Sequence, residues 1–173
     1  MENLTLGESF YLADENEAWN GGNSLFYRCP KLTSLTGLKL KQTYDNVKTI
    51  NKMFIRCDAL TEISFTEYEG GTTFQNLTSV ANMFTNNTVK PGTFFSDESG
   101  LRNLTTVHMN GWNTPKLTSM ASMFSGRSDD YEWTGCERLT TVEMNNWGNL
   151  KELTNVSRMF SGCESLKSEA KRS

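Results

Sequence analysis

Proline, histidine and long apolar runs are scarce in this chain. Its 173 residues include three prolines and one histidine. No stretch has the length and hydrophobicity needed to cross a bilayer, so we expect no membrane span in this chain. The first ten residues lack a basic segment followed by an apolar run, and we therefore expect no signal peptide.

Clustered positive charge is also lacking. Seventeen Lys and Arg residues stand against 20 Asp and Glu residues, which gives a formal charge of -3. No basic stripe is present that could neutralise phosphates, so nucleic acid is not an expected partner. Hydrophobic residues make up only 36%, while Asn, Thr and Ser recur throughout. This composition favours a folded, polar-surfaced domain over a disordered or membrane-embedded chain.

Phenylalanine recurs at intervals, each time directly after another apolar residue. A short phrase with apolar first and fourth residues precedes each of the last four pairs, so apolar residues fall at i, i+3, i+6 and i+7. That spacing predicts short helices of about two turns, with Thr78, Thr118 and Thr154 capping their first turns. The five pairs are Leu25-Phe26, Met53-Phe54, Met83-Phe84, Met123-Phe124 and Met159-Phe160.

A second phrase follows each pair and has the form L-x-x-L-x-L-x-x-W. Its middle alternates apolar and polar residues with period two, as a half-buried strand does, and its opening matches the leucine-rich-repeat frame. The first copy, Leu32–Leu40, fits this pattern loosely. Clearer copies are Leu60–Tyr68, Leu104–Trp112 and Leu139–Trp147.

Two of the units carry extra residues between these two phrases. Leu104 and Leu139 follow their Phe after 20 and 15 residues, against 6 in the other units. We therefore expect residues 1–18 to form an N-terminal partial unit or cap, and residues 168–173 a polar tail. Residues 19–167 would form the repeat domain, with insertions at 85–100 and 125–137. A short strand and a short helix bury little alone, so we expect neighbouring units to share one core.

The four cysteines occupy the same place in the repeat, three residues before the residue that opens the strand. The remaining unit has Leu101 in this slot, so the position accepts a plain hydrophobic residue. We predict buried free thiols at Cys29, Cys57, Cys136 and Cys163. Disulfides between adjacent units, Cys29 with Cys57 or Cys136 with Cys163, are the alternative. A zinc site is less favoured because no C-x-x-C pair exists.

Recognisable catalytic machinery is lacking. His108 is the only histidine, and no nucleophile is fixed near it by the repeat. The carboxylates have no spacing that forces a pair together, and no glycine loop for phosphates appears. We therefore expect no enzymatic activity, no cofactor and no metal. The open alternative is an enzyme that uses Asp129, Asp130, Tyr131 and Glu132 around a metal ion.

The segments Leu117–Gly126 and Val156–Leu166, joined through the Leu-Thr-x-Val-x-Met-x-x-Trp phrase, resemble the BspA-like leucine-rich repeats of bacterial surface proteins. The resemblance covers about residues 19–167. It implies cell-surface or secreted molecules of host-associated bacteria that adhere to host matrix proteins or other microbes. The family has no shared catalytic residues to transfer to this chain.

These observations predict an α/β fold, a leucine-rich-repeat solenoid of about five units with parallel strands on one face and short helices on the other. Trp112 and Trp147 are expected in its core, at the positions of Leu40 and Tyr68. Outward strand positions would form the binding surface. The candidate residues are Ser34, Thr36, Glu62, Ser64, Thr66, Thr106, His108, Asn110, Thr141, Glu143 and Asn145.

The functional hypothesis is a non-enzymatic module at the bacterial cell surface. It would mediate adhesion by binding a host or microbial extracellular protein or glycan. The alternative is an architectural spacer or stalk segment that has no ligand of its own. Charge reversal of Glu62 and Glu143 separates the two, because it should weaken adhesion and leave a spacer unaffected.

Overall fold

The structure is a computed structural model that describes residues 3–5, 26, 29–39, 43–54, 57–66, 70–85, 101–127 and 133–167. Within these ranges the secondary structure consists of strands and turns. The strands are β1 (Asn3–Thr5), β2 (Ser34–Lys39), β3 (Thr43–Tyr44), β4 (Glu62–Thr66), β5 (Thr72–Phe74), β6 (Thr106–His108), β7 (Trp112–Asn113), β8 (Ser125–Arg127), β9 (Trp133–Gly135) and β10 (Thr141–Glu143).

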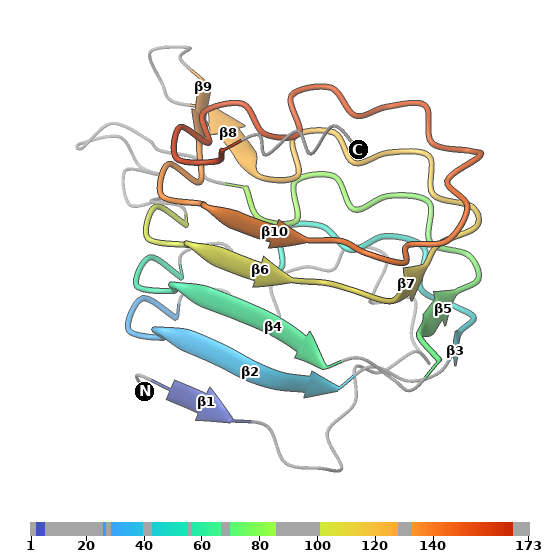
Figure 1. Cartoon of the computed structure of the whole chain (residues 1–173), viewed down its shortest axis with the longest axis horizontal. Coiled ribbons are helices and arrows are strands. Elements are labelled where there is room, and N and C mark those ends of the chain that lie inside the picture. The colour runs from blue at the N-terminus through green and yellow to red at the C-terminus, as the bar shows by residue number, and fades with distance from the viewer. Residues whose placement is uncertain are drawn as a thin grey trace.

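The leucine phrases form a parallel sheet, with one strand from each successive unit. Its strand order is β1-β2-β4-β6-β10, and all neighbouring strands are parallel (Figure 1). Leu35, Ile63, Val107 and Val142 lie in one register row, and the first three are completely buried. The predicted strands and their inward positions are therefore confirmed, and the arrangement is consistent with the strand face of a repeat solenoid.

A bulge in β2 explains the loose fit of the first leucine phrase. β2 pairs with β4 at Leu35 with Ile63 and again at Leu38 with Phe65, with a shift of register between the two pairs. The segment Thr36–Gly37 therefore lies opposite a single residue of β4. One additional residue in one strand of a pair is the definition of a β-bulge.

In each unit the chain continues from the first sheet into a second parallel sheet, which has the strand order β3-β5-β7. The chain enters β5 through Gly70 and Gly71, whose φ angles are +91° and +83°. A Cβ at Gly71 would lie 2.8 Å from the carbonyl oxygen of Gly111, which accepts a 2.8 Å hydrogen bond from the Thr72 amide. Glycine is required here both by the left-handed backbone and by the close approach of the neighbouring unit.

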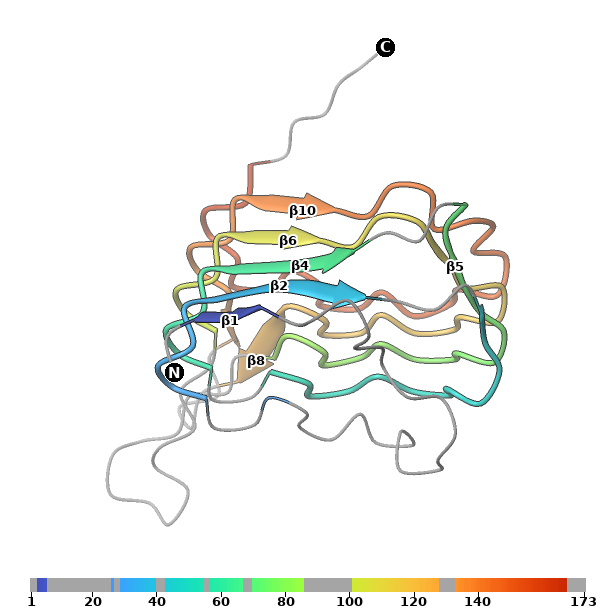
Figure 2. The same ribbon diagram turned by 90° about the horizontal axis from the view of Figure 1, so that it is seen from below.

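The phrases predicted as helices are the main correction to the expected fold. None of them is helical in the described residues. They form extended segments opposite the first sheet (Figure 2), linked by parallel bridges of Thr49 with Ser79, Ser79 with Ser119, and Ser119 with Asn155. The α/β class is therefore not what the described residues show, because both faces are built from parallel extended chain.

Hydrogen bonding between units explains the absence of helices. In an α-helix each amide donates to a carbonyl four residues earlier. Here the amides of Ile50, Val80 and Met120 donate to the next unit instead. A left-handed residue then turns the chain before each Met-Phe pair, and a helix cannot pass through it. These residues are Lys52, Asn82, Ser122 and Arg158, with φ between 51° and 58°.

The threonines predicted as helix caps make a different contact. The hydroxyl of Thr78 donates to the carbonyl of Lys48, that of Thr118 to Thr78, and that of Thr154 to Thr118. A second ladder of the same kind runs beside the first sheet. It consists of Thr61 with Thr33, Thr105 with Thr61, and Thr140 with Thr105. Threonine thus joins consecutive units.

Two ladders of aromatic rings form the centre of the core. Phe26, Phe54, Phe84, Phe124 and Phe160 stack with ring centroids 5.4, 5.4, 4.9 and 5.2 Å apart. Tyr44, Phe74, Trp112 and Trp147 form the other ladder, with centroids 4.8, 4.8 and 5.4 Å apart, and the planes of Phe74 and Trp112 in it are tilted by 46°. The tryptophans are 0% and 4% exposed, which confirms that they belong to the core. The residues of the earlier units in line with the tryptophans are Tyr44 and Phe74, where the repeat alignment predicted Leu40 and Tyr68, so this part of the alignment was wrong. Leu40 and Tyr68 themselves lie outside the described residues.

The two insertions are described only in part. Thr85 is buried, and residues 86–100 lie outside the described ranges. In the second insertion β8 and β9 pair as antiparallel strands, with Ser125 opposite Gly135 and Arg127 opposite Trp133. The carboxylates suggested for a metal enzyme, at 129, 130 and 132, are outside the described residues, and so are residues 6–25 and 168–173.

Removing a ring from the middle of the phenylalanine ladder should destabilise the whole stack. Phe84 is completely buried between Phe54 and Phe124. We expect Phe84→Ala to lower the free energy of unfolding by about 3–5 kcal/mol, because it removes a buried ring and leaves a cavity. Urea unfolding followed by circular dichroism measures this loss. Phe160→Ala is the control: Phe160 is 38% exposed and stacks on Phe124, so an equal loss in both variants would contradict the ladder.

Candidate binding face

The outward positions of the first sheet form rows that cross the strands. The register places Ser34, Glu62, Thr106 and Thr141 in one row, and Ser64, His108 and Glu143 in the next. Asn110 and Asn145 follow β6 and β10. All of these side chains are partly or fully exposed, as is Thr36, whereas the side chain of Thr66 is not described. We call this set without Thr66 the strand face.

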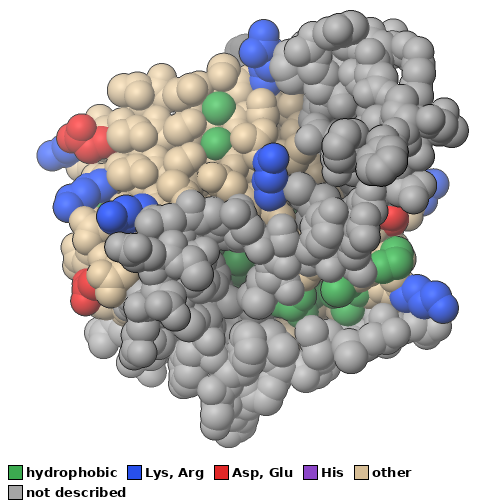
Figure 3. Space-filling model, turned by 180° about the vertical axis from the view of Figure 1, so that it is seen from behind, with side chains coloured by type: hydrophobic (Ala, Val, Ile, Leu, Met, Phe, Trp, Pro, Cys, Tyr) green, Lys and Arg blue, Asp and Glu red, His purple; other side chains and the backbone are tan. Residues whose placement is uncertain are grey.

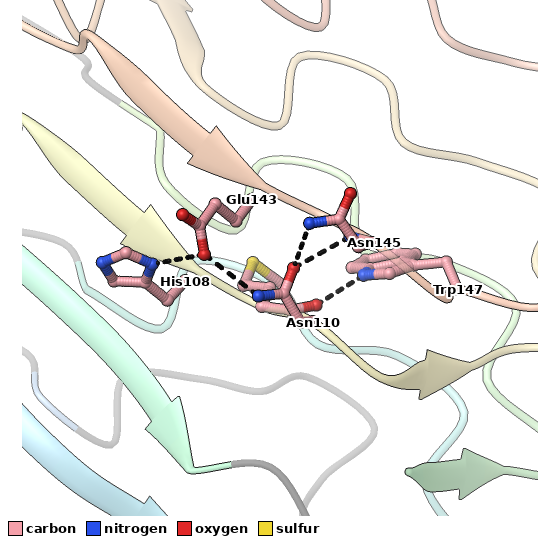
Figure 4. A network of polar contacts seen from close by, with 6 residues as sticks. His108, Asn110, Glu143, Asn145 and Trp147 are labelled. Atoms are coloured by element: carbon pink, nitrogen blue, oxygen red, sulfur yellow. Dashed lines mark hydrogen bonds and ion pairs between the residues drawn. The ribbon is translucent and has the colours of Figure 1, made fainter.

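The strand face contains a hydrogen-bonded network that the sequence did not predict. His108 Nδ1 lies 2.8 Å from Glu143 Oε2, and the same carboxylate oxygen accepts a 3.0 Å bond from Asn110 Nδ2 (Figure 4). The His108 and Glu143 side chains are 33% and 40% exposed. The network therefore lies at the surface and joins two adjacent units.

The asparagines extend this network along the unit boundary. Asn110 Oδ1 accepts bonds from the backbone amide of Asn145 at 2.9 Å and from its side-chain amide at 3.1 Å. Beneath them, Trp147 Nε1 donates to the carbonyl of Met109 at 2.6 Å. A buried ring and paired amides thus hold the polar side chains in one geometry.

The electrostatics of the network keep a negative charge at the surface. The hydrogen bond from His108, and then that from Asn110, lower the pKa of Glu143 below its ordinary value of 4.5. Its carboxylate is therefore ionised throughout the neutral range. Together with the amide oxygens, it makes this part of the strand face an acceptor of hydrogen bonds.

The sequence contains a signal for the pairing of His108 with Glu143 that neither residue shows on its own. Both occupy the fifth position of their leucine phrases, and in-register stacking makes equal positions neighbours. Superimposing Leu104–Trp112 on Leu139–Trp147 would have revealed the contact. The same comparison also places Asn110 beside Asn145.

The cysteines lie beside the phenylalanine ladder as two pairs, Cys29 with Cys57 and Cys136 with Cys163, and Leu101 occupies the same slot in the unit between them. Cys57, Cys136 and Cys163 are buried and Cys29 is half-buried, and all four are free thiols in the structure. Three of them donate to phenylalanine carbonyls: Cys57 to Phe26 at 2.8 Å, Cys136 to Phe84 at 3.5 Å and Cys163 to Phe124 at 3.5 Å. Each sulfur therefore reaches back to an earlier unit.

Burial and mutual contact change the acidity of these thiols. Burial raises the pKa of Cys57 to about 12. The hydrogen bond between Cys136 and Cys163, together with burial, raises the pKa of Cys136, while the same bond lowers the pKa of Cys163.

Metal ligands do not gather in the described ranges: no three His, Cys, Asp or Glu side chains there lie close enough to hold an ion. The described residues also include no helix that could cross a membrane. Seen from behind, Lys and Arg side chains are dispersed over the described surface rather than gathered in a stripe (Figure 3).

Comparison with known protein families finds a match over part of the chain. Residues 93–172 match the family described as "Mycoplasma protein of unknown function, DUF285". No curated protein matches the chain, and no solved structure matches it. The matched segment contains β6, β7 and β10, and with them the network of His108, Asn110, Glu143 and Asn145.

The depressed pKa of Glu143 predicts a pH-dependent contribution to stability. A carboxyl group whose pKa falls on folding stabilises the protein above its unfolded pKa, and this stabilisation is lost as the pH falls through the folded value. We expect the wild type to lose unfolding free energy relative to Glu143→Gln as the pH falls below 4.5. Urea titrations at several pH values measure the difference. Parallel curves for the two proteins would contradict the assignment, and His108→Ala should move the Glu143 titration midpoint upward.

The burial of the thiols predicts an order of chemical reactivity. In the folded protein, Cys163 should react with an aromatic disulfide reagent before Cys136, because Cys163 is 9% exposed whereas Cys136 is completely buried. Mass spectrometry of peptides after timed labelling gives the order. In urea the difference should vanish. Labelling of Cys136 as fast as Cys163 in the folded protein would contradict this difference in burial.

Proposed function

We propose that this chain is a non-enzymatic bacterial cell-surface module that mediates adhesion, with the strand face as its binding surface. The observation that carries the proposal is the in-register network of His108, Asn110, Glu143 and Asn145. The network presents fixed hydrogen-bonding groups on the first sheet, beside further rows of polar side chains. Such a surface suits the polar groups of an extracellular protein or glycan.

Rigidity of the strand face supports this role. The rows stand on a sheet whose inward residues Leu35, Ile63 and Val107 are completely buried. Side chains already held in place lose little conformational entropy when a partner binds, so more of the interaction energy appears as affinity. A flat, preorganised polar surface thus gains specificity from the register of its strands.

The resemblance to BspA-like leucine-rich repeats supports the same proposal. It suggests a cell-surface or secreted parent protein and a host or microbial macromolecule as the partner. The leucine-rich-repeat assignment itself belongs to this proposal, and its support is the parallel sheet formed by successive leucine phrases. The family matched by residues 93–172 is a Mycoplasma family, which agrees with a bacterial source.

An architectural spacer is the rival function. The two continuous aromatic ladders favour it, because they would make the stack stiff along its length. A spacer needs no partner for the strand face. Binding experiments on the purified protein therefore separate the two functions.

The test is binding to an array of extracellular-matrix proteins and glycans. We expect saturable binding that the double variant Glu62→Lys, Glu143→Lys weakens at least tenfold, equivalent to roughly 1.4 kcal/mol. Gln75→Lys, an exposed residue beyond β5 and away from the strand face, is the matched control and should bind as the wild type does. Absence of binding across the array would favour the spacer, and binding that survives the double variant would exclude the strand face.

A further inference from the structure

The stack brings the four cysteines together as two separate pairs. Cys29 and Cys57 occupy the same slot of adjacent units, and so do Cys136 and Cys163. The two thiols of each pair are in hydrogen-bonding contact. Leu101 fills the slot in the unit between the pairs and is completely buried. Each cysteine therefore has a single cysteine as its neighbour in this slot.

Hydrogen bonds to the backbone direct the later thiol of each pair toward the preceding unit. The amide of Cys136 donates to the carbonyl of Phe124 at 3.1 Å, and Cys163 Sγ donates to the same carbonyl oxygen at 3.5 Å. In the other pair, Cys57 Sγ donates to the carbonyl of Phe26 in the unit before it, at 2.8 Å. The sulfur of the later cysteine thus lies at the level of the earlier cysteine's unit.

The backbones around the second pair are packed closely on both sides of the cysteines. Before Cys136, a Cβ at Gly135 would lie 2.8 Å from the amide nitrogen of Cys163, so the two chains approach there as only glycine permits. After Cys136, the carbonyl of Glu137 accepts a 3.1 Å hydrogen bond from the amide of Ser165. These contacts fix the register in which the two cysteines lie side by side.

The spacing of the units matches the span of a disulfide. Neighbouring parallel strands lie about 4.8 Å apart, and the two Cα atoms of a disulfide are ~4.4–6.8 Å apart. Cys57 and Cys136 are two units apart, at roughly twice the strand spacing, which a disulfide does not span. Four cysteines can pair in three ways, and the stack allows the one that joins adjacent units.

We propose that the two cysteine pairs are redox sites, and that each pair closes to a disulfide between adjacent units, Cys29 with Cys57 and Cys136 with Cys163. The structure, in which all four cysteines are free thiols, is then the reduced form. The oxidant is a small-molecule disulfide.

The oxidation is a thiol–disulfide exchange in two steps. The thiolate of one cysteine attacks a sulfur of the small disulfide, which forms a mixed disulfide and releases a small thiolate that takes up the proton lost by the cysteine. The thiolate of the neighbouring cysteine then attacks the protein sulfur of the mixed disulfide and releases the second small thiolate, which is protonated in the same way. Two protein thiols are oxidised to one disulfide, and one small disulfide is reduced to two thiols.

The bridges would add covalent links to a stack joined by hydrogen bonds. Cys29 and Cys57 are 28 positions apart in the sequence, and Cys136 and Cys163 are 27 positions apart. Closing loops of this length reduces the conformational freedom of the unfolded chain and so favours the folded state. The unit that carries Leu101 would stay joined to both bridged pairs of units by noncovalent contacts alone.

Refolding in glutathione buffers tests the proposal. The fully reduced chain is diluted from urea into mixtures of reduced and oxidised glutathione, the remaining thiols are blocked, and mass spectrometry identifies the linked peptides. We expect two disulfides, Cys29 with Cys57 and Cys136 with Cys163. In urea titrations the equilibrium constant for unfolding of the oxidised protein should be at least about tenfold lower than that of the reduced protein, and dithiothreitol should restore the reduced value.

Cys163→Ala is the matched variant, because Leu101 shows that the slot accepts an apolar side chain. It should form the bridge between Cys29 and Cys57 alone and leave Cys136 without a protein partner. The double variant Glu62→Lys, Glu143→Lys alters the strand face and keeps all four cysteines. It should form both bridges, so the result stands apart from the proposed adhesion function.

Four results would overturn the proposal. One is a folded protein with four free thiols at every ratio of oxidised to reduced glutathione, and another is a mixture of pairings in the folded protein. A third is an oxidised protein that unfolds at a lower urea concentration than the reduced protein, because the folded geometry would then not accept the bridges. The fourth is a link from Cys136 to Cys57 in Cys163→Ala, which would contradict the separation of the two pairs.

Discussion

The described units of this protein are joined to their neighbours by ladders of backbone hydrogen bonds. The first sheet, the second sheet and the bridged segments are all parallel ladders between units, and the threonine hydroxyls add side-chain donors to the same carbonyls. A single unit removed from the stack would leave these groups unpaired. The aromatic ladders follow from this constraint, because strands in register place identical side chains about 5 Å apart, close to the spacing of neighbouring strands.

The candidate binding face depends on the same register. His108 and Glu143 meet because β6 and β10 pair at equal positions, and Asn110 meets Asn145 for the same reason. A shift of one residue would turn these side chains to the other face of the sheet. Stability and the geometry of the candidate binding face are therefore coupled, since the ladders that hold the units together also set the arrangement of the polar network.

Much of the architecture was determined by the sequence itself. The repeated Phe, Leu and Trp positions identified the units, the period of two identified the strands of the first sheet, and the shared slot of the cysteines predicted the burial of Cys57, Cys136 and Cys163. Only the tertiary structure decided between helix and extended chain for the phrases around Val80 and Met120, because spacing alone does not say whether an amide finds its partner within the unit or in the next one. It also decided the contact of His108 with Glu143, since this contact depends on which residues the stack brings together.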